Sequence, residues 1–131
     1  MEYVNENLRR KRELEDRTQR FAVSVFRFLD TLPPTASSRV VSYQLGKSAS
    51  SIGANYQVAN CAESRNDFVH ILRIVLKEAS ETQYWLKTLD KLYVGNERIR
   101  DLLAESTELV RIFQSSCRSL RANQDNNKIQ S

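Results

Sequence analysis

The stretch from Ala62 to Leu92 constrains the fold most, because its apolar residues recur in alternating steps of four and three. That spacing is typical of a helix packed lengthwise against another helix. The seam consists of Phe68, Leu72, Val75, Ala79, Thr82, Leu86 and Leu89. A second stripe, Ile71, Ile74, Glu78, Glu81, Trp85 and Leu92, runs beside it. The pattern predicts one long helix, about 64–93, that is buried on more than one side and N-capped by Ser64, three residues before Asp67.

The one strip of this helix left for solvent is basic and contains no acid. It consists of His70, Arg73, Lys77, Ser80, Tyr84, Lys87 and Lys91, and is called the basic strip below. Each lysine or arginine can neutralise a phosphate, and a tyrosine ring can stack on a base. The candidate nucleic-acid-binding residues are therefore Arg73, Lys77, Tyr84, Lys87 and Lys91. An ordinary solvated helix face is the other interpretation of the same residues.

Three further helices are predicted around the first. An apolar periodicity indicates a helix over about 8–32, which Pro33 and Pro34 end because proline lacks the amide donor. Ser37 or Ser38 is placed to cap a helix over 38–59, and Gly95 separates the helix at 64–93 from one over 96–121. The tail, 123–131, is polar without periodicity and is expected to be frayed. No strand alternation occurs, and the chain has three glycines and two prolines. We therefore expect a single all-α domain over 1–131, an antiparallel up-down four-helix bundle.

The helix at 38–59 is unusual because Lys47 is the only charge between Arg39 and Glu63. A helix without charge seldom presents a whole face to water, and its small residues allow close approach by neighbours. We expect it to be buried on one side by its own bundle and on the other by a second subunit. A weak helix that packs only within its own bundle is the alternative.

Glu78 and Glu81 occupy positions where the second stripe of the 64–93 helix calls for apolar side chains. Paired carboxylates can serve as acid and base. A structural role is favoured, because half-buried carboxylates usually have basic or polar partners, here Arg39, Lys47 or Asn55. The predicted structural polar network consists of Asn55, Ser64, Asp67, Glu78 and Glu81.

The sequence argues against an enzyme, a cofactor and a bound metal. A di-iron bundle needs two Glu-x-x-His motifs, whereas His70 is the only histidine and no such motif exists. No P-loop or dinucleotide fingerprint is present. No run approaches the roughly 20 apolar residues that span a membrane, and the first twenty residues carry charges throughout, unlike a signal peptide. We expect no membrane association and a cytoplasmic location.

Several motifs resemble one family closely. They are Ser51 to Tyr56, Ala62 to Ser64, the pair Asp67-Phe68 and the run from Leu76 to Leu86. They resemble the bacterial four-helix bundle proteins encoded in intervening sequences of 23S ribosomal RNA genes. Many members have a glycine-rich turn after the asparagine, where this chain has Tyr56-Gln57-Val58-Ala59.

The resemblance implies a homo-oligomeric ring, a pentamer in known relatives, with no known enzymatic activity. The chain is also similar to the accessory protein of diversity-generating retroelements, a basic pentameric barrel that binds nucleic acid and a reverse transcriptase. By this analogy we expect a non-enzymatic oligomer that binds RNA or DNA, or assists a nucleic-acid enzyme. A protein-interaction scaffold without direct nucleic-acid contact is the alternative.

Overall fold

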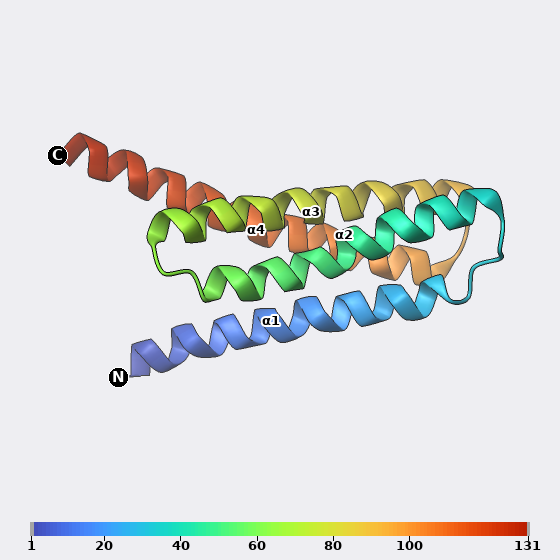
Figure 1. Ribbon diagram of the computed structural model, residues 1–131, viewed down its shortest axis with the longest axis horizontal. Coiled ribbons are helices and arrows are strands. Elements are labelled where there is room, and N and C mark those ends of the chain that lie inside the picture. The colour runs from blue at the N-terminus through green and yellow to red at the C-terminus, as the bar shows by residue number, and fades with distance from the viewer. Residues whose placement is uncertain (1, 131) are drawn as a thin grey trace.

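The computed structural model describes residues 2–130 and has an all-α architecture. Within that range there are four helices and no strand: α1 (Glu2–Leu29), α2 (Ala36–Asn60), α3 (Arg65–Leu92) and α4 (Glu97–Gln130). Successive helices run in opposite directions, so the two termini lie at the same end of the bundle (Figure 1). Neighbouring helices pack in the order α1, α2, α3, α4, while α4 touches α1 over a shorter stretch. No helix in the described residues is both long and apolar enough to cross a membrane.

The helix caps agree with the sequence at α3 and differ at α2. Ser64 caps α3 as predicted, its hydroxyl accepting a hydrogen bond from the amide of Asp67 at 3.1 Å. The cap of α2 is Thr35, not Ser37 or Ser38, and Ser38 completes a reciprocal capping box with it. The turn after the two prolines puts Thr35 in the extended conformation that an N-cap requires.

Two helices are longer than predicted. α1 begins at Glu2 instead of near Leu8, and α4 continues to Gln130 instead of ending at 121. The structure continues the helix over residues 123–130, where the sequence predicted a frayed tail, and Ser131 lies outside the described residues. The side chains of Ala122 and Asn123 are exposed, and a solvated helix end needs no apolar periodicity.

The predicted apolar seam of α3 is confirmed as the centre of the core. Six of its seven members are buried, and Phe68 is half-buried and packs against the same cluster. The seam meets side chains from every other helix. The largest fully buried ones are Phe28 on α1, Leu45 and Ile52 on α2, and Ile99, Leu109 and Phe113 on α4.

Each pair of neighbouring helices also shares a polar side-chain contact. In the core, Thr82 of α3 donates to the Ser48 hydroxyl of α2 at 2.9 Å, and both residues are at most 1% exposed. The other contacts are Asn60 to Glu15 between α2 and α1, Gln83 to Thr107 between α3 and α4, and Arg17 to Glu105 between α1 and α4. These bonds are directional, so they fix the register of helices that apolar packing alone would let slide.

Gly53 allows α1 and α2 to approach closely. A Cβ at this position would lie 2.9 Å from the Oγ1 atom of Thr18 and 3.4 Å from its backbone carbonyl carbon. Thr18 cannot withdraw easily, because it is fully buried and its hydroxyl is bonded to the carbonyl of Leu14 at 2.9 Å. A Cβ at Gly46 would instead meet the edge of the Phe26 ring at 3.2 Å, and that side chain is 47% exposed.

These two glycines therefore give a matched pair of stability variants. We expect Gly53→Ala to lower the free energy of unfolding by about 1–2 kcal/mol, because overpacking against Thr18 outweighs the helical preference of alanine. We expect Gly46→Ala to leave it unchanged or raise it by up to about 1 kcal/mol, because Phe26 can turn toward solvent. Urea unfolding followed by circular dichroism measures both. Equal stability of the two variants would contradict the close approach at Gly53.

Candidate nucleic-acid interface

The basic strip lies on the solvent side of α3. This helix packs on α2 along one flank and on α4 along the other, so only one longitudinal strip remains open to water. The structure brings all five predicted binding residues together there, and each is exposed: Arg73, Lys77, Tyr84, Lys87 and Lys91. His70 and Ser80 are exposed in the same strip. The strip can therefore present four cationic side chains to one extended ligand.

Tyr84 is both held in place and accessible. Its ring packs edge-on against Trp85, with 5.0 Å between the ring centroids and 80° between the planes. The side chain is nevertheless 60% exposed. An aromatic ring that is supported on one side and open on the other suits stacking on a nucleobase.

Two of the four carboxylates of α3, Glu78 and Glu81, lie beside the basic strip. Glu78 is half-buried, and burial raises the pKa of its carboxyl above the usual value of 4.5. The neighbouring charge of Glu81 acts in the same direction, while Lys77 and Lys47 act against it. Neither carboxylate forms an ion pair or a side-chain hydrogen bond with another described residue.

The predicted structural network forms only in part within one chain. Ser64 and Asp67 meet at the α3 cap, as described above. Asn55 does not reach Glu78 or Glu81, because its amide donates to the carbonyl of Ser51, one turn earlier on α2, at 2.8 Å. A partner for the two carboxylates from a second subunit stays a prediction.

A second surface carries apolar residues that the sequence patterns did not single out individually. On α1 and α2, several large apolar side chains are 41–67% exposed. They are Val23, Phe26, Val40, Tyr43 and Val58, and they define the α1–α2 face. A groove of about 530 Å³ runs between the two helices here and includes Val23, Phe26, Gly53 and Ala54. The one signal in the sequence was the near absence of charge in α2.

The described residues contain no group of three or more histidine, cysteine, aspartate or glutamate side chains that could hold a metal ion. What the geometry offers is therefore a basic, partly aromatic surface on α3 and an apolar one on α1 and α2.

Comparison with known proteins gives the family. The family model for the 23S rRNA-intervening sequence protein matches residues 10–115. The chain belongs to this family. It is also similar to a crystal structure of a protein of unknown function from the S23 ribosomal protein family of Bacteroides thetaiotaomicron. That similarity has a TM-score of 0.71 and 36% sequence identity, and covers 79% of this chain and 96% of the other. No curated protein matches the chain.

Membership in the 23S rRNA-intervening sequence family confirms the resemblance drawn from the motifs in α2 and α3. All of those motifs lie within the matched residues, 10–115. The helical extension of α4 beyond Phe113 lies largely outside the match. The basic strip, in contrast, lies wholly inside it.

The position of Glu78 predicts a pH-dependent effect on stability. Because the folded-state pKa is raised, the protein prefers Glu78 protonated, and stability falls as pH rises from the usual value of 4.5 through the folded value. We expect Glu78→Gln to melt at a higher temperature than the parent at pH 7 and at the same temperature near pH 4. Thermal unfolding by circular dichroism at the two pH values measures this.

The same substitution distinguishes burial from pairing. A Glu78→Gln variant that melts lower than the parent at pH 7 would mean that the carboxylate is paired with a base in the assembled protein. Lys77→Gln is the matched control, since it removes a neighbouring charge without relieving the burial of Glu78.

Proposed function

We propose that this family member is a non-enzymatic homo-oligomer that binds RNA or DNA through the basic strip of α3. The observation that carries the proposal is the sorting of charge on this helix. Four exposed cations and an exposed tyrosine share one strip, and the acidic residues of α3 lie outside it. The net charge of the chain is only +4, so the sorting matters more than the total.

Phosphate binding explains the composition of the strip physically. Each lysine or arginine that neutralises a phosphate releases condensed counterions, which makes binding favourable and strongly dependent on salt. A tyrosine among these cations adds stacking that tolerates any base. Such a surface favours binding with little sequence preference, in the manner of an accessory protein to a nucleic-acid enzyme.

Assembly would strengthen this binding. The α1–α2 face exposes large apolar residues around an α2 helix whose only charge between Arg39 and Glu63 is Lys47. Exposed apolar patches of this kind commonly mark contact surfaces. In a closed ring, for which the family resemblance implies a pentamer, the basic strip would repeat around the symmetry axis and engage one strand several times. We place this assembly in the cytoplasm.

Fluorescence anisotropy with labelled single-stranded RNA and duplex DNA tests the proposal. We expect Lys77→Glu/Lys87→Glu to abolish binding, because two attractive charges become repulsive at the centre of the strip. Binding by the parent protein should weaken steeply between about 50 and 200 mM salt.

The matched control is Arg10→Glu/Lys11→Glu, which changes the net charge equally at exposed positions on α1. It should bind nearly as well as the parent. Absence of binding by the parent even at low salt, or equal loss in both double variants, would overturn a role for the strip.

A protein-interaction scaffold is the second candidate function, and the exposed apolar residues of the α1–α2 face favour it. Docking through such a face depends on apolar burial and responds little to salt. A salt-insensitive protein complex, in a chain that binds no nucleic acid, would identify this alternative.

Self-association gives a further prediction. We expect the parent chain to sediment as a multiple of its 15.2 kDa mass. Tyr43→Glu and Val58→Glu should each shift it toward the monomer, because a carboxylate buried in an apolar contact loses its hydration. Val94→Glu is the control, since Val94 is 84% exposed in the turn between α3 and α4. Sedimentation velocity measures all three. Assembly that withstands both α2 substitutions would exclude this face as the contact.

A further inference from the structure

A groove lined by arginines separates α1 from α4. These helices touch over only a short stretch, and a cleft of about 590 Å³ lies along their boundary. Phe21 and Leu102 form apolar parts of its lining and are 3% and 8% exposed. The charged lining consists of Arg17, Arg20, Arg27, Arg98, Asp101 and Glu105. Arginines thus outnumber acids by two, and no lysine contributes.

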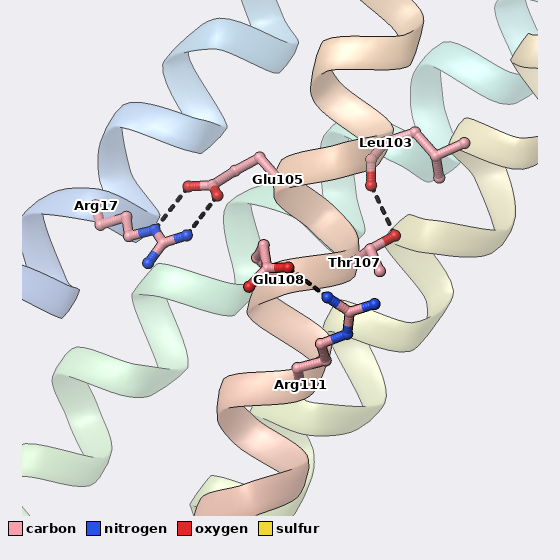
Figure 2. A network of polar contacts seen from close by, with 6 residues as sticks. All are labelled: Arg17, Leu103, Glu105, Thr107, Glu108 and Arg111. Atoms are coloured by element: carbon pink, nitrogen blue, oxygen red, sulfur yellow. Dashed lines mark hydrogen bonds and ion pairs between the residues drawn. The ribbon is translucent and has the colours of Figure 1, made fainter.

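One of these arginines is committed to the fold. Arg17 reaches from α1 to Glu105 on α4, and its Nε and Nη2 atoms donate to the two carboxylate oxygens at 2.8 and 2.6 Å. Figure 2 shows this forked contact bridging the two helices. Arg20 has a partner as well, Asp16, at 3.0 Å on the same helix. The bridge fixes the spacing of α1 and α4 at one point of the groove.

The other two arginines carry the excess positive charge. Neither Arg27 nor Arg98 forms an ion pair with a described residue. The guanidinium carbon of Arg98 lies 5.3 Å from the centroid of the Phe28 ring, which is 1% exposed. A guanidinium placed on a buried ring is oriented by that contact while its N–H groups stay available. Arg27 stands in the last turn of α1, on the opposite wall.

From this arrangement we infer that the α1–α4 groove is a second phosphate-binding site, which holds the backbone of a single nucleic-acid strand. Guanidinium groups bind phosphate oxygens in pairs with fixed geometry, better than lysine does. Apolar walls strengthen the field of the arginines inside the groove. The inference rests on the proposed nucleic-acid function and adds a separate site to it.

The length of the groove favours a polymer over a single anion. Arg17 and Arg27 are about 15 Å apart along the axis of α1, at a rise of about 1.5 Å per residue. A chain of phosphates can meet Arg27 and the Nη1 group of Arg17, which the bridge to Glu105 leaves without a partner in the described residues, whereas one small anion cannot. A narrow positively charged channel that follows the backbone is typical of single-strand binding.

The groove and the basic strip lie on different parts of the bundle. α3 packs on α2 and α4 and makes no close backbone contact with α1 in the described residues. The two sites can therefore be altered independently. This separation makes it possible to distinguish failure of one site from failure of the other.

The test is anisotropy of a labelled single-stranded RNA with the full chain over a series of salt concentrations. We expect Arg27→Gln/Arg98→Gln to weaken binding by about tenfold and to reduce the salt slope by about two, one for each phosphate contact removed. Arg10→Gln/Lys11→Gln removes two exposed cations of α1 outside the groove lining and should change neither quantity. The double variant also loses the contact of Arg98 with Phe28, which could unfold the chain. Arg27→Gln alone avoids this, because Arg27 is exposed, and should still reduce the salt slope by about one.

Three results would overturn the inference. Equal binding by the groove variants and their control, with loss of binding in Lys77→Glu/Lys87→Glu, would leave the basic strip as the site and exclude the groove. Loss of affinity without a change in salt slope would mean that the two arginines stabilise the fold and do not contact phosphate groups. No binding by the parent chain at low salt would exclude the groove and the proposed function together.

Discussion

The burial of α3 between two neighbours is the constraint on which the rest of the structure depends. Its apolar seam fills the core, Thr82 bonds to α2 on one flank, and Gln83 bonds to α4 on the other. A helix held in this way exposes only one strip to water, so its solvated polar side chains must lie on that strip. The basic character of the strip is therefore a choice of sequence that the fold leaves open. Residues of this strip can therefore be selected for ligand binding with little effect on the stability of the fold.

The same constraint explains which parts of the fold were predictable. A buried seam leaves a periodic trace in the sequence, so α3 and its cap at Ser64 were predicted nearly to the residue. Residues 7–13 of α1 and 121–123 of α4 are exposed, and a solvated helix end leaves no such trace. At the start of α2, three hydroxyl residues compete within four positions. The turn that follows Pro33 and Pro34 selects Thr35, which local sequence alone does not determine.

The candidate surfaces also differ in how far they could be predicted from the sequence. The basic strip lies on a single helix, so a helical repeat was enough to find that its five candidate binding residues share one exposed surface. The arginine groove brings together Arg27 and Arg98, which lie far apart in sequence, and depends on which helices become neighbours. The bridge from Arg17 to Glu105 could not be predicted from the sequence for the same reason. Exposure of Tyr43 and Val58 could not be predicted either, because an apolar residue of α2 can face the core as readily as a partner.

Charge and apolar surface are separated in this bundle in a way that allows assembly and binding at once. Contacts through the outer face of α2 would bury large apolar side chains and at most two cations, Arg39 and Lys47. The ammonium group of Lys47 already lies 6.0 Å from the centre of the Tyr43 ring. Burying the cations of α3 or the arginines of the groove would instead require their desolvation, which is costly without well-placed partners. A ring built through the α1–α2 face would therefore leave both basic surfaces accessible. A ring built through the strip or the groove would remove the positive charge that distinguishes them.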